Sequence, residues 1–317
     1  MKVARYKAYG GPDHIEIAEQ PDPVARAGEL LVRVHASSVN PVDWKIAAKY
    51  FPFNIMRAGI PYVPGLDVAG VVVTAAGSFR EGDRVFSRIP GIKGGTSAEL
   101  VAFDPRVAAK IPDAMGYHEA AAIPLAGLTA LQGLRDQARL PMTDAAGVRV
   151  LVIGASGGVG HFAVQIAHAT GAHVTGVCSG RNAAMVGELG ADEVIDYTQV
   201  TTWNAGGEFD VILDCVGGVS PGRFTRWLNK RGTYANTLPN AGILLRQLAS
   251  SIGLGRRVRG VMLRPDGDDL RVLCKLSEAN KFRAVIDEVF PLDRVADAHR
   301  KSITGRARGK IVVEVAP

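Results

Sequence analysis

The sequence predicts an α/β protein made of two domains, a β-rich unit followed by a parallel, doubly wound sheet. Two observations carry this prediction. Through the first hundred or so residues, short β-like runs alternate with Gly, Pro and Asp turns, as in barrels and sandwiches. Further along, apolar strands alternate regularly with helical patterns, as in sheets that are buried on both faces. We expect the first domain to span residues 1–120 and the second to span 121–284.

The β-rich domain is predicted from the runs KVARYKAY, HIEIAEQ, ELLVRVHASSVN, VAGVVVTA, DRVFS and AELVAFD. After the second domain, the chain returns to this style with RAVIDEVF, a helical LDRVADAHRKSI and a final KIVVEV. We therefore expect residues 285–317 to complete the first domain, so that the second domain is an insertion between its halves.

The second domain begins with a helical stretch over residues 118–138 that is interrupted near Pro124. Its predicted strands are 148–153, 173–178, 193–196, 209–216, 232–236 and 258–264. Residues 237–257 fit either a loop or a short helix. The last strand would leave an exposed sheet edge in a monomer, and pairing of that edge near 258–264 predicts a homodimer.

Composition excludes several classes of protein. The 317 residues are 47% hydrophobic and carry a net charge of +6, and the basic residues are scattered except in Arg256–Arg259, so we expect no nucleic-acid partner. The three cysteines share no metal-ligand spacing, and no apolar run is long enough to span a membrane. We therefore expect a soluble, cytoplasmic protein with no membrane partner and a small-molecule substrate.

A glycine-rich loop lies between a predicted buried strand and an amphipathic helix in VLVIGASGGVGHFAVQIAHATGA. Gly154, Gly157 and Gly160 would permit a tight turn, close approach of a pyrophosphate and close packing of helix on strand. Ser156, Gly158 and Val159 belong to the same loop. In this setting the pattern predicts a dinucleotide-binding site, the alternative being a glycine-rich turn without a ligand.

The end of the second strand indicates which dinucleotide is bound. Sites selective for NAD place an Asp or Glu there to bind the ribose diol, whereas this strand ends in VCSGRN. Ser179, Arg181 and Asn182 would supply a hydroxyl, a guanidinium and an amide, which suit the extra phosphate of NADPH. The alternative is that Arg181 is an ordinary solvated residue at the start of a helix.

Eight motifs in order along the chain resemble those of the medium-chain dehydrogenase/reductases, in particular their zinc-free quinone oxidoreductase branch. They are ASSVNPVDWK, PGLDVAGVV, AAAIPLAGLTAL, GASGGVG, VCSGRN, LGADEVIDY, DVILDCVGG and ARGKIVVEV. The resemblance covers essentially the whole chain. It implies a GroES-like catalytic domain joined to a Rossmann-type domain.

The zinc alcohol dehydrogenases of that superfamily hold their catalytic metal at places that match Asn40, the turn Gly65–Asp67 and Leu125 in this sequence. Leucine at 66 and 125 cannot bind a metal, and one amide with one carboxylate would not make a zinc site. We therefore expect no metal. For Asp67 we expect a structural role, through hydrogen bonds to turn backbone or an ion pair with Lys45 or an arginine.

The resemblance also implies the remaining site residues. It places Asn40 at the nicotinamide and the substrate, and Lys45 is a candidate for stabilising an anion or supplying a proton; a turn residue and a solvated lysine are the alternatives. Residues implied to line the cofactor are Thr129, Tyr197, Cys215, Val216 and Gly217.

Without zinc there is no Lewis acid to ionise an alcohol, so an acceptor that is already activated is expected. The leading prediction is an NADPH-dependent oxidoreductase that delivers hydride to a quinone or an α,β-unsaturated carbonyl. An enoyl-thioester reductase is the nearest alternative. A protein that binds NADPH without catalysis is the other.

Overall fold

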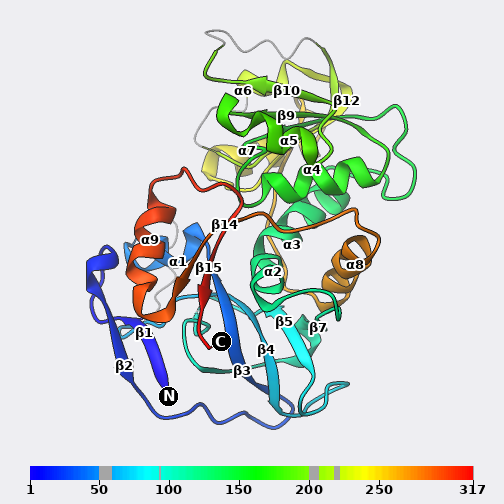
Figure 1. The fold of residues 1–317 in the computed structure, drawn as a ribbon. Coiled ribbons are helices and arrows are strands. Elements are labelled where there is room, and N and C mark those ends of the chain that lie inside the picture. The colour runs from blue at the N-terminus through cyan, green and yellow to red at the C-terminus, as the bar shows by residue number, and fades with distance from the viewer. Residues whose placement is uncertain (50–58, 93, 200–206, 218–221, 317) are drawn as a thin grey trace. The chain divides into compact units, whose positions relative to one another are not determined.

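The chain forms two compact units in a computed structural model that describes residues 1–49, 59–92, 94–199, 207–217 and 222–316 (Figure 1). The β-rich unit comprises Met1–Leu125, Pro265–Glu278 and Ala284–Pro317. The parallel-sheet unit comprises Ala126–Arg264 and Ala279–Arg283. The chain therefore leaves the first unit after residue 125, returns to it with 265–278, adds 279–283 to the second unit and ends in the first.

The β-rich unit is organised around one mixed sheet with the order β14-β15-β3-β4-β5-β7, in which β6 also pairs with β3. A separate ribbon joins β1 and β2. Strand β15 lies between β14 and β3, so the late part of the chain completes this sheet, as predicted. The strands are β1 (Lys2–Tyr6), β2 (Ile15–Glu19), β3 (Leu30–Val39), β4 (Asp67–Thr74), β5 (Arg84–Arg88), β6 (Leu100–Phe103), β7 (Ala108–Lys110), β14 (Ile286–Pro291) and β15 (Lys310–Glu314).

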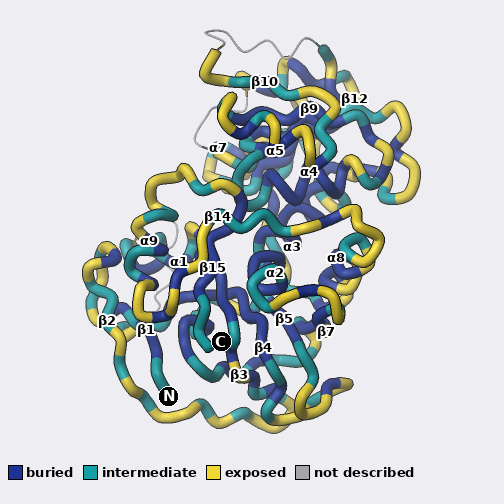
Figure 2. The backbone as a smooth tube through the Cα atoms, in the orientation of Figure 1, coloured by how far each residue is buried: buried dark blue, intermediate teal, exposed yellow. Residues whose placement is uncertain are grey.

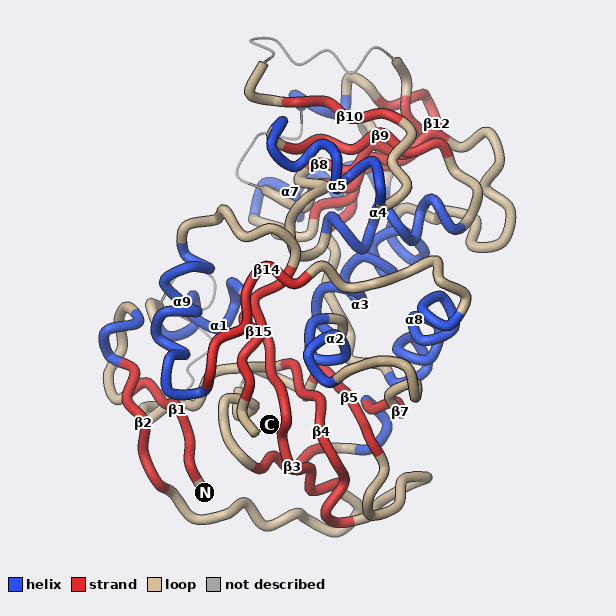
Figure 3. Tube along the Cα trace, in the orientation of Figure 1, coloured by secondary structure: helices blue, strands red, loops and turns tan. Residues whose placement is uncertain are grey.

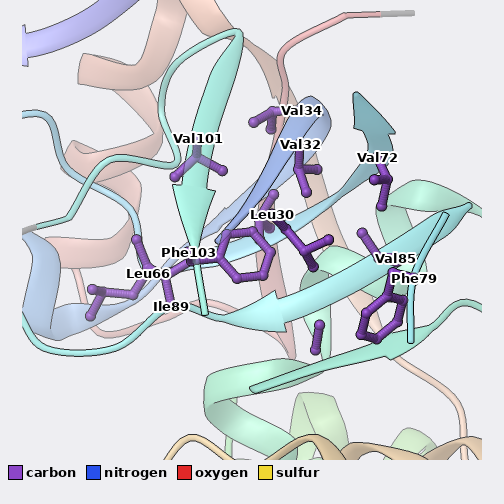
Figure 4. Packing of buried hydrophobic residues seen from close by; sticks show 12 residues of the cluster. Leu30, Val32, Val34, Leu66, Val72, Phe79, Val85, Ile89, Val101 and Phe103 are labelled. Atoms are coloured by element: carbon purple, nitrogen blue, oxygen red, sulfur yellow. The ribbon is translucent and has the colours of Figure 1, made fainter. Parts of the chain in front are cut away.

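The core of the β-rich unit is formed by alternate apolar residues of these strands (Figure 4). Leu30, Val32 and Val34 of β3 point to one face and pack with Leu66 and Val85. In a strand, successive side chains point to opposite faces, which is why the period of two in ELLVRVH translates into a buried stripe. β4, which pairs with β3, is buried from its first residue, Asp67.

The helices of the β-rich unit include one that the sequence placed in the other domain. Helix α8 lies within the predicted range 121–284, but it packs on β7 (Figure 1). Its Leu270 and Leu273 are fully buried, and a side chain at Gly267 would collide with backbone carbonyls of residues 106 and 108. An amphipathic pattern shows that a helix has a buried face but not what covers that face. The helices are α1 (Pro41–Ala47), α2 (Tyr117–Ala122), α8 (Gly267–Glu278) and α9 (Val295–Ile303).

The parallel-sheet unit has the strand order β10-β9-β8-β11-β12-β13, and every pairing in it is parallel. This confirms the predicted doubly wound sheet, and the near-continuous burial of β8, β9 and β11 explains their unbroken apolar runs. Figure 2 shows this burial for β9. The strands are β8 (Arg149–Ile153), β9 (His173–Cys178), β10 (Glu193–Asp196), β11 (Phe209–Asp214), β12 (Leu228–Asn236) and β13 (Arg257–Gly260).

Helices α4 and α5 pack against the β8, β9 and β10 part of this sheet (Figure 3). The predicted interruption at Pro124 separates α2 from α3, and α3 ends in a π-helical turn over Gly133–Gln137. Residues 237–257 contain a helix, one of the two alternatives predicted. The helices are α3 (Pro124–Gln132), α4 (Gly160–Ala169), α5 (Ala183–Glu188), α6 (Gly222–Thr225) and α7 (Ala241–Ser251).

Strand β13 ends the sheet in the described chain, but its outer edge is not free. The backbone N–H of Gly260 donates to the side-chain oxygen of Gln247 at 2.8 Å, and the N–H of Val258 donates to Ser250 Oγ at 3.4 Å. Both side chains belong to α7, which therefore lies along this edge. A homodimer formed by pairing the edge near 258–264 stays a prediction, and at Val258 and Gly260 it would have to displace the α7 side chains that already bind their outward groups.

Candidate functional site

The glycine-rich loop joins the end of β8 to the start of α4, as predicted. Gly154 has a φ of +77°, and a side chain at Gly160 would collide with the backbone of Gly154 and Ala155. The N–H groups of Gly154 and Ala155 both donate to the carbonyl of Val177, at 3.0 and 2.9 Å. The loop therefore needs glycine at both ends and is held against β9.

The middle of this loop suits an anionic group. A side chain at Gly157 would meet only the carbonyl oxygen of Gly154, at 3.4 Å, so the backbone is open there. Ser156, Gly158 and Val159 are half-buried. N–H groups at the start of a helix have no partner within that helix; in this loop the Gly157 N–H donates to the carbonyl of Gly154 and the His161 N–H donates to the carbonyl of Gly157, each at 3.0 Å. A pyrophosphate fits this arrangement because a helix N-terminus and open backbone N–H groups favour negative charge.

Three polar residues that the sequence assigned to the cofactor lie together beside the loop. The Asn182 amide donates to Ser156 Oγ at 3.0 Å and to Ser179 Oγ at 3.3 Å. Asn182 is buried, so its amide ties the start of α5 to the glycine-rich loop. Arg181 is exposed next to this cluster, in the short 3-10 turn Gly180–Asn182.

The second strand ends without a carboxylate, but a carboxylate of the neighbouring strand lies near this turn. Asp196 ends β10, which pairs in register with the end of β9, and a side chain at Gly180 would collide with its carboxylate. Hydrogen bonds from the hydroxyl and backbone N–H of Thr198 hold the pKa of Asp196 below its usual range. The sequence signal that could have located Asp196 was the parallel order of the strands, because parallel order brings the carboxyl ends of neighbouring strands to one edge of the sheet.

The loop after β11 is shaped by a buried carboxylate. Asp214 Oδ1 accepts from the N–H groups of Val216 and Gly217, at 2.9 and 3.0 Å. Its Oδ2 accepts from the Tyr234 hydroxyl at 2.6 Å and from the Asn236 amide at 3.2 Å. Asp214 therefore fixes the loop through Oδ1 and joins it to β12 through Oδ2.

This second loop lies against the glycine-rich one. A side chain at Gly154 would meet Val216, and the Cys215 N–H donates to the carbonyl of Ile153 at 3.0 Å. Val216 is largely exposed, and Gly217 has a φ of +68°. The structure therefore brings 154–160 together with 215–217 at the carboxyl ends of adjacent strands, which is where open α/β sheets bind ligands.

The remaining predicted cofactor residues are placed separately. Tyr197 follows β10 as an exposed side chain, and its N–H donates to the carbonyl of Cys178 at 3.1 Å. Thr129 is buried within α3. Tyr197 directly follows Asp196 at the end of β10, so the two residues lie at the same edge of the sheet.

Asp67 is the centre of a buried polar cluster in the β-rich unit. Its Oδ2 accepts from Ser38 Oγ at 2.7 Å and from the Asn40 amide at 2.8 Å. Its Oδ1 accepts from the backbone N–H of Leu125 at 2.8 Å. The side chain is fully buried, so these bonds replace the hydration that the carboxylate gives up.

The basic partner of Asp67 is Lys310 of β15. The Lys310 ammonium lies 3.7 Å from Asp67 Oδ2 and donates to Asn40 Oδ1 at 2.6 Å. Burial lowers the pKa of Lys310, and Asp67 and Asp43 oppose that shift. Of the predicted partners, Lys45 is instead half-buried in α1 beside the Trp44 ring, and burial lowers its pKa. The other predicted partner was an arginine, and Arg88 is one: burial lowers its pKa and the charge of Asp67 opposes that shift. Sequence reasoning missed Lys310. The signal that could have found it was a single lysine at the start of the apolar run KIVVEV.

Asn40 is therefore held from both sides of its amide, by the carboxylate of Asp67 and the ammonium of Lys310. It is also the residue before α1, where its backbone N–H donates to Asp43 Oδ2 at 2.7 Å. Burial raises the pKa of Asp43 to about 7, and the hydrogen bond from Asn40 partly opposes this. Three buried atoms near these charges lack a partner among the described residues: Asp43 Oδ1, Tyr62 OH and Arg88 Nε.

These residues do not fit a zinc ion. Leu66 and Leu125 have no donor atom in their side chains, and both oxygens of Asp67 are already bound. Lys310 supplies the positive charge that a metal would otherwise bring. Within the described ranges, no three His, Cys, Asp or Glu side chains are grouped so that they could hold a metal ion.

Family models match both units. Residues 26–113 match the alcohol dehydrogenase GroES-like domain, and residues 189–313 match the family described as zinc-binding dehydrogenase. The chain is 35% identical to the chloroplast envelope quinone oxidoreductase homolog of Arabidopsis thaliana, over 99% of this chain and 98% of that protein. It is 33% identical to human mitochondrial NAD(P)H oxidoreductase RTN4IP1, over 90% of this chain and 82% of that protein.

Solved structures agree with these matches. The quinone oxidoreductase from Coxiella burnetii superposes with a TM-score of 0.91 at 29% identity, covering 100% of this chain and 99% of that one. The predicted combination of a GroES-like domain and a Rossmann-type domain is thereby confirmed. By sequence along nearly its whole length and by fold, the chain belongs to the quinone oxidoreductases of the medium-chain dehydrogenase/reductase superfamily.

Proposed function

We propose that the protein is a zinc-independent, NADPH-dependent oxidoreductase that reduces a quinone or an α,β-unsaturated carbonyl. The observation that carries this proposal is the bonding of Asp67, whose oxygens are taken by Ser38, Asn40 and the Leu125 N–H beside the Lys310 ammonium. A residue so occupied is not available to a metal. Acceptors that need no Lewis acid are then the consistent substrates.

The cofactor assignment is supported by the glycine-rich loop and by the loop 215–217 beside it. When bound, a reduced nicotinamide supplies the hydride, and the protein supplies orientation and electrostatics. The relatives named NAD(P)H oxidoreductases are consistent with such a cofactor.

The choice of NADPH rests on the balance between Arg181 and Asp196. The exposed guanidinium favours a 2′-phosphate by charge-assisted hydrogen bonding. The Asp196 carboxylate opposes the binding of a 2′-phosphate, but its oxygens already accept hydrogen bonds from Thr198 and from the backbone of Gly180. We therefore assign the phosphate to Arg181, with Ser179 as the neighbouring hydroxyl.

Asn40 and Lys45 are the residues that we assign to the substrate side. One N–H of the Asn40 amide donates to Asp67. We assign the second N–H to a substrate oxygen that gains negative charge. Lys45, whose pKa is lowered by burial, would carry charge or a proton to the same oxygen.

Oxidation of NADPH should be followed with a simple quinone, an alkenal, an alkenone and a crotonyl thioester. Turnover with the quinone or the enones above the thioester supports the proposal. Preference for the thioester would identify an enoyl-thioester reductase instead. Tight NADPH binding without turnover on any acceptor would leave only a binding protein.

Two substitutions should shift cofactor preference in opposite directions. Arg181→Glu should raise the KM for NADPH by roughly ten- to a hundredfold with less effect on NADH, because a charge-assisted bond worth about 1.5 to 3 kcal/mol is lost. Asp196→Asn should lower the KM for NADPH, because a negative charge near the phosphate is removed. Arg231→Glu, also exposed in the same unit, is the control and should change neither. Equal loss for both cofactors with Arg181→Glu would contradict the assignment.

A further inference from the structure

Helix α7 has an inner face that is fixed and an outer face that is apolar. Ile243 is buried, and Gln247 and Ser250 bind the edge of β13, so these three residues mark the inner face. The outward side chains are large and apolar, with exposed fractions from 52 to 71%. They are Leu244, Leu245, Leu248, Ile252 and Leu254, which we call the leucine face.

The spacing of these residues makes the leucine face continuous. Leu244 and Leu248 are four residues apart and share one side of α7, with Leu245 beside them. Ile252 and Leu254 follow the last helical residue, Ser251. Solvent-exposed apolar residues are normal when scattered, but a contiguous group on one helix usually marks an interaction surface. The remaining question is what covers it.

The charge of the surrounding chain answers that question. Between Asp214 and Asp266 the sequence has no acidic residue, while its basic residues are Arg223, Arg226, Lys230, Arg231, Arg246, Arg256, Arg257, Arg259 and Arg264. Arg246, Arg256 and Arg257 are exposed on or just after α7. Burial and the nearby guanidiniums of Arg257 and Arg139 lower the pKa of Arg259, so positive charges crowd here. Arg264 lies 3.9 Å from the Asp136 carboxylate.

We infer that the leucine face and its flanking arginines dock the protein on an anionic lipid surface. A helix with an apolar face and basic residues beside it lies in the plane of such a surface, with its leucines among the acyl chains and its arginines at the headgroups. No helix in the described part of the chain is long and apolar enough to cross a membrane. The contact is therefore peripheral.

A second copy of the chain is the competing occupant, and the charges disfavour it. A twofold contact through α7 would bring two sets of Arg246, Arg256 and Arg257 together with no acidic residue of this segment to pair with them. An anionic surface instead gains from each of them. The proposal concerns a surface and does not depend on the proposed reaction.

The test is sedimentation of the full chain with vesicles, without cofactor or acceptor. Wild-type protein should bind vesicles of mixed phosphatidylglycerol and phosphatidylcholine and should not bind phosphatidylcholine alone. The triple change Leu244→Gln, Leu245→Gln, Leu248→Gln should weaken binding by roughly tenfold or more, and so should Arg256→Gln with Arg257→Gln. High salt should weaken binding by wild type, because exposed charges are screened.

Matched controls remove similar groups from the β-rich unit. Val24→Gln removes an apolar side chain that is 89% exposed, and Arg26→Gln with Arg80→Gln removes two exposed charges. Both should bind as wild type does, and thermal melting of each variant verifies that it is folded. Analytical ultracentrifugation of wild type and of the leucine variant tests whether a second copy of the chain covers the leucine face instead.

Three results would overturn the inference. The first is that wild-type protein does not bind the anionic vesicles. The second is that the leucine variant binds them as well as wild type does. The third is that wild type is a dimer and the leucine variant is a monomer. In the last case the face belongs to a second copy. None of these results bears on the oxidation of NADPH, which is measured separately.

Discussion

Lys310 carries a positive charge into the interior of the β-rich unit, where it meets Asp67 and Asn40. Burying two charges has a large desolvation cost that their attraction offsets only with good geometry and further hydrogen bonds. Here the carboxylate gains three neutral donors and the ammonium gains two oxygen acceptors. The pair fixes both ends of the Asn40 amide, which links it to the proposed substrate side.

Removing one partner of this pair should be costly. We expect Lys310→Met to lower the free energy of unfolding by about 3–5 kcal/mol, because Asp67 is left buried and unpaired. In the double variant Lys310→Met, Asp67→Asn, the loss of unfolding free energy should be smaller than the sum of the losses in the two single variants. Urea unfolding measures both.

Lys301→Met is the control for that experiment. Lys301 pairs with Asp287 and Glu288 on the surface of the same unit, so its loss should cost less than about 1 kcal/mol. Equal effects of the two lysine substitutions, or strict additivity with Asp67→Asn, would contradict the interpretation of Lys310 as the counter-ion.

Asp43 should make stability depend on pH in an unusual direction. Its pKa of about 7 lies above the ordinary value of 3.8, so between these values the folded protein keeps a proton that the unfolded chain releases. The contribution of Asp43 to stability therefore falls as pH rises from about 4 to 7 and stays low above that. In Asp43→Asn, which keeps an acceptor for the Asn40 N–H, this fall should be absent.

Denaturant melts of both proteins at several pH values test this expectation. The difference in unfolding free energy between Asp43→Asn and wild type should shift in favour of the variant as pH rises from 5 to about 7 and then level off. A difference that is constant across this range would contradict it. The difference is informative because the surface carboxylates are common to both proteins.

Among the elements, the loop between β8 and α4 separates two roles of glycine. We expect Gly160→Ala to destabilise the protein by about 1–3 kcal/mol, because a side chain there collides with the backbone of Gly154. Gly157→Ala should change stability by no more than about 0.5 kcal/mol, because its position is open, yet it should weaken NADPH binding. Thermal melts and fluorescence titration with NADPH distinguish the two effects.

If Gly157→Ala bound NADPH as wild type does, the pyrophosphate would not approach the loop there. A large loss of stability in Gly157→Ala would contradict the open geometry.

The elements that the sequence predicted best are those with strong periodicity and unambiguous breakers. Strands 173–178 and 193–196 have the predicted bounds, and the break near Pro124 separates two helices. Helix α8 was assigned to the wrong unit, because amphipathicity does not identify the partner surface. The edge of β13 was expected to be free, because a polar residue such as Gln247 does not reveal that it binds a neighbouring backbone.

The sequence predicted those parts of the candidate site whose residues are neighbours along the chain. The glycine-rich loop is local, so its residues are visible as one motif. The contacts of Asp67 with Lys310 and of Gly180 with Asp196 join residues that are distant in the chain or on neighbouring strands. Such pairs depend on strand order, which periodicity does not encode.

At the scale of the whole molecule, the β-rich unit is built from three separate segments of the chain. Its sheet has β15 between β14 and β3, while all the strands of the parallel sheet lie between the first and the second of these segments. A family model accordingly matches residues 26–113, and another matches 189–313, which runs across the return of the chain into the β-rich unit.

The position of β15 also sets the order in which the protein can be completed on the ribosome. Domains usually fold as units while synthesis proceeds, but the β-rich unit lacks an inner strand until residues 310–314 have been made. Until then Asp67 has no ammonium beside it. The parallel-sheet unit, begun later, has all its strands earlier, so the half of the protein that is translated first is finished last.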